Sequence, residues 1–239
     1  MWINNYKSKN IVINQFMGLG DILFSIPIAE YFYSLGYNIT WPINNEFLNI
    51  KKNFNYINFI DKNSLNINYE SIDIVENENF LIIPLRFSNN LLNNGDPSTC
   101  MSDKYKYIDL DLNMWKNLKW ERDKPTENKL YYDILGLKDD EEYNLVNETY
   151  NMDKKISIDI NNGLKTIQFK IIENFNILDW YKVIENATNI YTVGTSLIFL
   201  IEVIPTKKLN QYILYPRKPI ENNCSYYNYL LDKVTKENN

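Results

Sequence analysis

The sequence predicts an α/β protein with mainly parallel sheets, and three observations support this fold class. Short apolar runs recur along the chain, as at residues 80–85, and such runs are typical of strands buried on both faces. Segments with helical periodicity lie between the runs, and this alternation favours parallel sheets. A glycine-rich turn, Gly18-Leu19-Gly20-Asp21, joins the first run to the first helix.

In the first half, strands and helices alternate up to a polar, Gly- and Pro-containing segment at 88–99, which is predicted to be a loop. A polar spacer at 63–79 precedes the fourth strand. The predicted strands are 11–16, 38–43, 56–60, 80–85 and 107–112, and the predicted helices are 21–35 and 46–54.

A second α/β set follows the segment 120–125, which is the best candidate for a domain boundary. The predicted strands are 143–147, 166–169, 189–193 and 211–215, and the predicted helices are 125–135, 176–187, 197–203 and 226–236. Each half therefore has one strand–turn–helix unit of this kind, and the turn of the second unit is Gly194-Thr195-Ser196. Ligands bind outside the carboxyl ends of such strands, so two Rossmann-like halves facing each other would enclose a cleft.

Composition excludes several classes of function. The 239 residues suit one large domain or two small ones, and the net charge of −5 provides no basic field for nucleic acid. The chain has no histidine, which excludes Ser-His-Asp and Cys-His catalysis and His-ligated zinc. Cys100 and Cys224 lie far apart, which favours a reduced compartment. With no signal core and no membrane-spanning run, the expected location is cytoplasmic.

The first turn combines features of an anion site with an acid. Gly18 and Gly20 allow backbone N–H groups to approach a ligand, and the following helix N-terminus favours an anion. Asp21 would repel a phosphate there, so it fits better as a base that faces a neutral hydroxyl. The alternative is that Asp21 is a helix N-cap or first-turn acid that contributes about 1 kcal/mol of stability.

Residues 18–27 resemble the N-terminal signature of the heptosyltransferase-like glycosyltransferases of GT-B fold, in which a Gly-Asp turn precedes an apolar helix containing proline. Residues 180–201 resemble the nucleotide-sugar-binding element of that family. Thr195 is kept there, whereas Gly194 replaces the family's Asp and Phe199 stands in place of its His. The resemblance covers the N-terminal third and about a quarter of the remainder. Because the chain is shorter than a full family member, at least one β-α unit of the C-terminal half is expected to be missing.

The resemblance implies an inverting, metal-independent transfer of a sugar from a nucleotide-diphosphate sugar to a hydroxyl of a glycan or other acceptor, without a cofactor. It implies an acceptor-side Rossmann-like lobe at 1–122, a reduced nucleotide-sugar-binding lobe at 123–239, and Asp21 as the base. The expected donor-binding residues are Gly18, Gly20, Lys170, Thr192, Gly194, Thr195 and Ser196. Arg86, just past the strand at 80–85, is the expected acceptor-binding residue.

Each of these assignments has an alternative. Thr195 and Ser196 are also good capping residues, and Lys170 and Arg86 are charges that could simply be solvated. The changes at Gly194 and Phe199 favour a second function, that of a non-catalytic sugar- or nucleotide-binding GT-B descendant.

Three further motifs are weaker. Asp109-Leu110-Asp111 has the spacing of a metal-binding Asp pair, but its apolar neighbours favour an amphipathic strand. A dinucleotide site is disfavoured because Leu23 occupies the third glycine position. Gly163-Leu164-Lys165-Thr166 lacks the earlier glycine of a P-loop.

Overall fold

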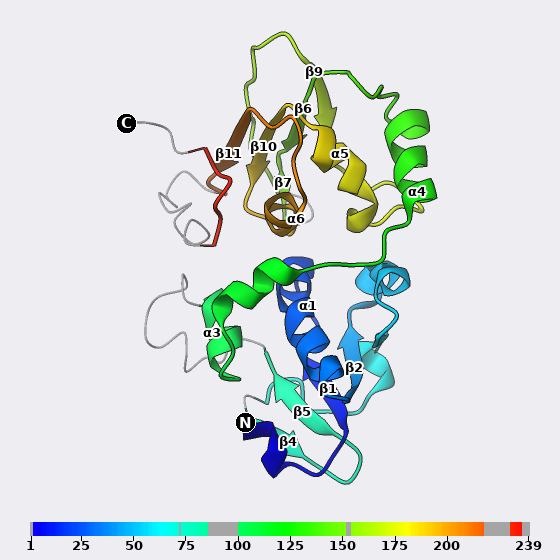
Figure 1. The fold of residues 1–239 in the computed structure, drawn as a ribbon, viewed down its shortest axis with the longest axis vertical. Helices are drawn as coiled ribbons and strands as arrows, with labels where there is room; N and C mark the ends of the chain where they lie inside the picture. Colours follow the sequence, from blue (N-terminus) through cyan, green and yellow to red (C-terminus); the bar gives the residue numbers. More distant parts are fainter. Residues whose placement is uncertain (1, 72, 86–99, 152–153, 218–229, 236–239) are drawn as a thin grey trace. The chain divides into compact units, whose positions relative to one another are not determined.

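A computed structural model gives the fold, and it describes residues 2–71, 73–85, 100–151, 154–217 and 230–235 (Figure 1). The chain divides into two compact units, unit 1 (Met1–Glu121) and unit 2 (Arg122–Asn239), and each holds a mainly parallel sheet. The predicted α/β class with mainly parallel sheets is confirmed. The acceptor and donor roles of 1–122 and 123–239 stay predictions.

The residues on either side of the division are bound within their own units. In unit 1, the Glu121 backbone N–H donates to the Asn53 carbonyl (3.0 Å), and Asn53 Nδ2 donates to the Glu121 carbonyl (2.8 Å). In unit 2, the Arg122 guanidinium pairs with Glu127 and lies over the Tyr181 ring, with Cζ 3.4 Å from the centroid.

Within its described residues, unit 1 holds a sheet in the order β3-β2-β1-β5-β4, with β4 antiparallel and the other strands parallel. Its strands are β1 (Asn10–Asn14), β2 (Asn38–Ile43), β3 (Ile57–Asp61), β4 (Val75–Glu76) and β5 (Leu81–Pro84). Its helices are η1 (Trp2–Asn5), α1 (Leu19–Ser34), η2 (Asn45–Asn53), η3 (Lys62–Ser64), α3 (Cys100–Lys106) and η5 (Leu112–Asn117).

The core of unit 1 explains these elements. The apolar residues of β1 and β5 are buried, as expected for central strands of a parallel sheet. On α1, Phe24 packs against the rings of Tyr105 and Trp115, with centroids 5.3 and 5.5 Å apart. The Tyr105 hydroxyl also donates to the Phe24 carbonyl (2.7 Å), so α3 and η5 are fixed against α1.

The predicted strand at 107–112 is wrong. The chain ends α3 at Lys106, turns through Asp109 at a φ of 56°, and enters η5. Asp111 is the N-cap of η5, where Oδ1 accepts a hydrogen bond from the Asn113 N–H (2.9 Å). Asp109 and Asp111 therefore do not lie on one face of a strand, which was the geometry expected for a metal-binding Asp pair.

Within its described residues, unit 2 holds a fully parallel sheet in the order β11-β10-β6-β9 and a short antiparallel pair, β7-β8. Its strands are β6 (Tyr143–Asn147), β7 (Thr149–Tyr150), β8 (Lys154–Lys155), β9 (Lys165–Gln168), β10 (Asn189–Val193) and β11 (Gln211–Tyr215). Its helices are α4 (Lys124–Asn128), η6 (Lys129–Ile134, a π-helix), η7 (Ile177–Trp180), α5 (Tyr181–Asn186) and α6 (Leu197–Val203).

The connection from β6 to β9 departs from the usual strand–helix–strand unit. Its described residues contain the β7-β8 pair and an extended segment, with no helix among them. Ile158 of this segment is buried against Val146 and Tyr191, and Ile156 and Ile160 pack around them. Extended chain thus covers part of the sheet that a crossover helix covers in most parallel folds.

Two predicted segments fall wholly or partly outside the described residues: the loop at 88–99 and the helix at 226–236. Of the latter, 230–235 are described and are not helical. None of the helices in the described ranges combines the length and apolar character that a bilayer crossing requires.

Candidate functional site

The sheet order of unit 1 defines where a ligand would bind. From β1 the chain runs outward to β2 and β3, and it then returns to β5 on the other side of β1. The switch point therefore lies between β1 and β5, and ligands of open α/β sheets bind at the carboxyl ends of the strands there. We call the residues gathered at this place the carboxyl edge of unit 1. They are Gln15, Gly18, Asp21, Leu85 and Lys104.

Gly18 makes room for the Asp21 carboxylate. It is the N-cap of α1 and has a φ of 75°, a conformation that L side chains rarely adopt. A Cβ at this position would lie 2.5 Å from Asp21 Oδ2. The carboxylate thus lies over the bare backbone of Gly18, and Asp21 itself is an acid of the first turn of α1 rather than its N-cap.

The side chain that holds Asp21 is Lys104, which sequence reasoning missed. Its ammonium lies 3.1 Å from Asp21 Oδ1, and it donates to Gln15 Oε1 (2.8 Å) and to the Leu85 carbonyl (2.6 Å). Only 2% of the Lys104 side chain is exposed. A buried ammonium is tolerated when it is hydrogen-bonded and paired with an opposite charge. Here the Gln15 and Leu85 oxygens accept its hydrogen bonds, and the Asp21 carboxylate faces it as the ion-pair partner.

Gln15 is fixed in turn by its own hydrogen bonds. Its Nε2 donates to the Met17 carbonyl (2.6 Å), and its backbone carbonyl accepts from the indole of Trp41 (2.8 Å). The turn after β1 and the position of Lys104 are therefore determined by one connected set of buried contacts.

The two oxygens of Asp21 have different surroundings. Oδ1 is buried and faces the Lys104 ammonium, and no directed hydrogen bond reaches it from the described residues. The side chain as a whole is 24% exposed, so its accessible surface lies on other atoms, with Oδ2 on the side of Gly18. Oδ1 thus faces the buried ammonium, and Oδ2 lies over the backbone of Gly18.

An aromatic pair lies beside this turn. The rings of Phe16 and Tyr69 meet edge to face with centroids 5.0 Å apart, and the Lys62 ammonium lies 4.8 Å over the Phe16 ring. Burial, and after it the charge of Asp61, raises the pKa of Tyr69, so its hydroxyl stays protonated at neutral pH. Tyr69 is therefore a hydrogen-bond donor beside this turn, and its hydroxyl donates to the Lys62 carbonyl (2.5 Å).

In unit 2 the switch point lies between β6 and β10, because the chain passes from β6 to β9 and returns to β10. The carboxyl edge of unit 2 is formed by Asn147, Thr192, Gly194, Thr195 and Arg217. Asn147 ends β6, and its Nδ2 donates to the hydroxyl oxygens of Thr192 and Thr195, both at 3.0 Å. The predicted donor-site residues Thr192 and Thr195 are thus joined by a residue that the sequence did not single out.

The predicted donor residues differ in how far a ligand can reach them. Thr195 and Ser196 are half-buried, whereas Thr192 and Gly194 are buried, and the Thr192 hydroxyl donates to the Val193 carbonyl (2.9 Å). A direct contact between Thr192 and a donor would require this internal bond to break. Lys170, which follows β9, is exposed.

Three other predicted residues lie elsewhere. Gly20 is half-buried in the first turn of α1. Arg86 lies outside the described residues. Phe199, which stands where the resembling family has a His, is 2% exposed within α6 and belongs to the core.

The missed residues come from segments without a recognisable motif. Arg217 follows β11, and its Nε donates to the Gly194 carbonyl (2.5 Å). The signal for Lys104 is its position on α3. With Met101, Tyr105 and Ile108 it forms a buried stripe with helical spacing, in which a lysine is out of place unless it is paired.

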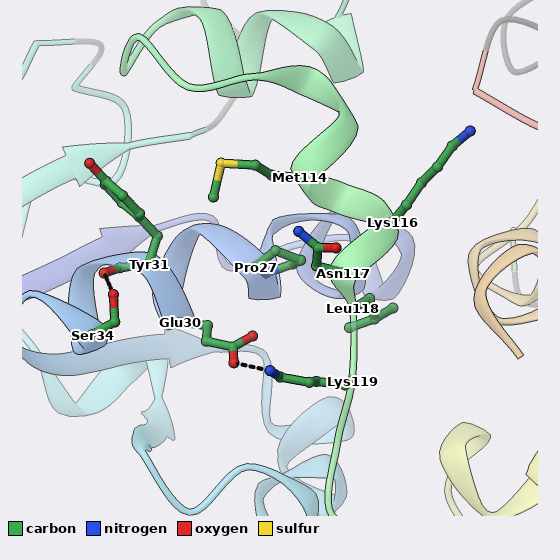
Figure 2. Close-up of a pocket in the computed structure, with 9 residues that line it drawn as sticks. All are labelled: Pro27, Glu30, Tyr31, Ser34, Met114, Lys116, Asn117, Leu118 and Lys119. Atoms are coloured by element: carbon green, nitrogen blue, oxygen red, sulfur yellow. Dashed lines mark hydrogen bonds and ion pairs between the residues drawn. The ribbon is translucent and has the colours of Figure 1, made fainter.

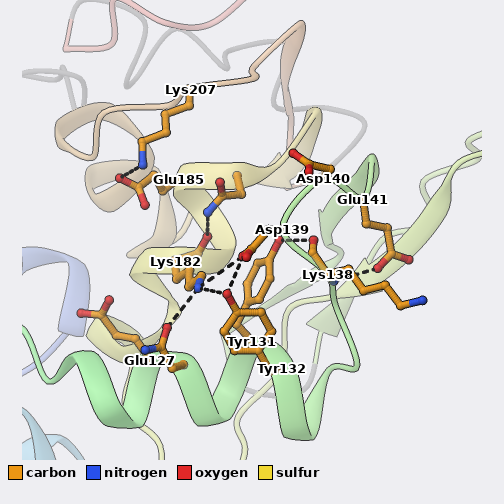
Figure 3. A network of polar contacts seen from close by, with 12 residues as sticks. Glu127, Tyr131, Tyr132, Lys138, Asp139, Asp140, Glu141, Lys182, Glu185 and Lys207 are labelled. Atoms are coloured by element: carbon orange, nitrogen blue, oxygen red, sulfur yellow. Dashed lines mark hydrogen bonds and ion pairs between the residues drawn. The ribbon is translucent and has the colours of Figure 1, made fainter.

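Two other polar features lie outside the site. A pocket of about 530 Å³ lies between α1 and η5, where Glu30 pairs with Lys119 at 2.8 Å, and neither Asp21 nor Lys104 lines it (Figure 2). In unit 2, Lys182 lies 3.9 Å over the Tyr132 ring and 3.6 Å from Asp139 Oδ1 (Figure 3). The charge of Lys182 is thus matched within this network, which ties α5 to the segment after η6.

No protein-family model matches the chain, and no curated protein matches it by sequence. The chain is similar to the structure of a glycosyl transferase family 9 protein from Veillonella parvula, with a TM-score of 0.50 and 10% identity over 94% of this chain and 93% of that one. It is also similar to TibC, an iron-containing dodecameric glycosyltransferase from enterotoxigenic E. coli, with a TM-score of 0.48 and 11% identity. That match covers 86% of this chain and 57% of TibC, so this chain spans little more than half of TibC. The similarity to the family 9 structure confirms the resemblance to heptosyltransferase-like GT-B glycosyltransferases at the level of the fold.

Proposed function

We propose that the protein is a glycosyltransferase that moves a sugar from a nucleotide-diphosphate sugar to an acceptor hydroxyl. The observation that carries this proposal is the Asp21 carboxylate, with Oδ1 held by the buried Lys104 and Oδ2 over Gly18. The fold similarity to a family 9 glycosyl transferase over 94% of the chain supports it. A carboxylate fixed in this way at a switch point is suited to act as a general base.

In the proposed reaction, Asp21 Oδ2 accepts the proton of the acceptor hydroxyl. The hydroxyl oxygen attacks the anomeric carbon of the donor sugar, and the bond from that carbon to the phosphate oxygen breaks. The nucleoside diphosphate leaves with the electron pair. A single displacement of this kind inverts the anomeric configuration, and it needs a second site that stabilises the negative charge of the leaving group.

We assign the leaving group to unit 2, with Thr195 and Ser196 as its hydroxyl donors and Gly194 as the residue that allows close approach. Thr192 does not contact the leaving group directly. It acts through its hydrogen bond with Asn147. Lys170 and Arg86 remain proposed contacts for the donor phosphate and the acceptor, and Gly18 and Gly20 for the backbone approach of the donor. No metal is required, because these groups are hydrogen-bond donors and cations.

A panel of nucleotide-diphosphate sugars tests this function. Release of nucleoside diphosphate is measured with simple glycosides as acceptors, in the presence and absence of EDTA. We expect one donor class to turn over, with EDTA having no effect and the product having the opposite anomeric configuration by NMR. Retention of configuration, or a need for a divalent ion, would contradict the proposed mechanism.

The second candidate is a sugar- or nucleotide-binding protein without catalysis, and the replacements at Gly194 and Phe199 favour it. Phe199 is buried, so it cannot do what a His at the donor would do. This candidate predicts that a donor raises the thermal midpoint of the protein and that no acceptor releases its nucleoside diphosphate.

A further inference from the structure

The direction of the hydrogen bonds at the carboxyl edge of unit 2 is fixed by the backbone. Asn147 Oδ1 accepts from the Thr149 N–H (3.3 Å), so the amide nitrogen must be the atom that faces Thr192 and Thr195. Asn147 therefore donates a hydrogen bond to both hydroxyl oxygens and accepts none from either.

The Thr195 hydroxyl can consequently make only one further kind of hydrogen bond. Its oxygen accepts from Asn147 Nδ2 at 3.0 Å and from the Leu197 N–H at 3.4 Å, which occupies both lone pairs. The remaining capacity of the half-buried group is its O–H, which can only donate. A ligand that meets Thr195 here must provide an acceptor.

Arg217 adds a cation at the same turn. Its Nε donates to the carbonyl of Gly194, the residue before Thr195, so the guanidinium lies against this turn. A guanidinium has no acceptor, and its Nη groups carry four further N–H donors in a planar arrangement that suits phosphate oxygens. Among the described residues, no carboxylate forms an ion pair with Arg217, in contrast to Lys165, Lys182, Lys207 and Lys208.

We propose that Arg217 is the cation of the donor site, where its Nη groups bind the phosphate oxygens of the nucleoside diphosphate beside the Thr195 O–H. Asn147 is the positioning residue that keeps this O–H directed outward. The assignment rests on the proposed function and moves the main phosphate contact from Lys170 to Arg217. Lys170 is exposed after β9, whereas Arg217 is tethered to the turn that carries Thr195.

The test is isothermal titration of the full chain with UDP, GDP, ADP, CDP and inorganic pyrophosphate. Arg217→Gln keeps an amide donor near Gly194 but is neutral, and Lys170→Gln removes the same charge from an exposed position of the same unit. We expect Arg217→Gln to weaken binding of the preferred diphosphate by about tenfold or more, and Lys170→Gln by about threefold or less. Thermal midpoints recorded without ligand check that both variants are folded.

Salt dependence gives a readout that a purely structural role would not change. If Arg217 neutralises phosphate, the loss of affinity between low and high salt should be smaller in Arg217→Gln than in the wild type and in Lys170→Gln. Arg217→Lys restores the charge without the planar fork, so we expect it to recover part of the affinity.

The outcomes separate this inference from the proposed function. Equal binding by Arg217→Gln and the wild type would overturn the role of Arg217, even if sugars are transferred. Loss of diphosphate binding in Arg217→Gln, with no transfer from any donor, would support Arg217 and count against the glycosyltransferase. A wild-type protein that binds no diphosphate and no pyrophosphate would overturn both.

Discussion

The carboxyl edges of the two sheets are built alike but have opposite hydrogen-bonding character. In unit 1, a buried cation occupies the Gln15 and Leu85 oxygens and one oxygen of Asp21, and the remaining group is a carboxylate oxygen that accepts. In unit 2, a buried amide occupies the hydroxyl oxygens, and the remaining groups are the Thr195 O–H and the Arg217 guanidinium, which donate. One edge is suited to take a proton and the other to hold an anion.

The difference shows that the glycine turn alone does not determine the chemistry of a strand–turn–helix unit. The turn sets the position of the edge, whereas a buried residue from outside the turn determines which hydrogen-bonding groups remain there. In unit 1 this residue is Lys104 from α3, and in unit 2 it is Asn147 from β6.

The largest expected effect comes from removing the buried cation. Lys104→Met removes the donor of the Gln15 and Leu85 oxygens and the cation that faces Asp21, so we expect unfolding free energy to fall by about 3 kcal/mol and turnover to be lost. Lys119→Met is the matched control, because its ion pair with Glu30 has a lysine that is 75% exposed, and it should cost about 1 kcal/mol or less. Urea denaturation measures the unfolding free energy of both variants. Equal losses would show that the buried Lys104 stabilises unit 1 no more than the exposed Lys119 does.

A smaller effect is expected at Gly18. Gly18→Ala forces a side chain into a φ of 75° and places its Cβ 2.5 Å from Asp21 Oδ2. Gly36→Ala meets the same backbone penalty at a φ of 84° with nothing within 4 Å, so it should cost only about 1 kcal/mol. We expect Gly18→Ala to cost about 2–3 kcal/mol and to abolish turnover, measured by thermal unfolding and nucleotide release. Full activity in Gly18→Ala would show that transfer does not depend on the position of the Asp21 carboxylate.

The smallest effect distinguishes the two threonines of unit 2. Thr192→Val removes an internal donor to the Val193 carbonyl, so it should lower stability by about 1–2 kcal/mol without affecting nucleotide affinity directly. Thr195→Val removes the outward O–H, so it should weaken nucleotide binding about tenfold. It also removes the acceptor of Asn147 Nδ2 and the Leu197 N–H, so it should lower stability by about 1–2 kcal/mol, whereas Thr195→Ser keeps both affinity and stability. Calorimetric titration and unfolding curves of Thr192→Val, Thr195→Val and Thr195→Ser measure nucleotide affinity and stability. A larger loss of affinity in Thr192→Val than in Thr195→Val would contradict these roles.

Much of the fold could be predicted from the sequence where one physical signal dominates. The bounds of β2, β6, β10, α6 and β11 agree with the prediction, since each is an apolar run bounded by turn or polar residues. The segment at 107–112 failed because Ile108, Leu110 and Leu112 alternate as in a strand. Contacts of Tyr105 with Phe24 instead hold α3 in place, and such contacts are not visible locally.

The candidate site was predictable only in its turns. Gly18, Asp21 and Thr195 stand in recognisable patterns, and the structure places each at the carboxyl end of its sheet. Lys104 is separated from Gln15 by 89 residues and Asn147 from Thr195 by 48, so only the folded chain brings these pairs together. The sequence therefore identified the turns at the two carboxyl edges but not the buried residues that hold them, and the binding roles of these turns stay predictions.

The division of roles between the two edges is tested most directly by measuring donor affinity and turnover separately for Asp21→Asn and Thr195→Val, with the donor that the wild type uses. We expect Asp21→Asn to bind the donor as the wild type does and to lose turnover by about a hundredfold or more. Thr195→Val should instead lose affinity and keep turnover at saturating donor. If Asp21→Asn kept its turnover, the carboxylate would not be the base and the division of roles between the two edges would be wrong.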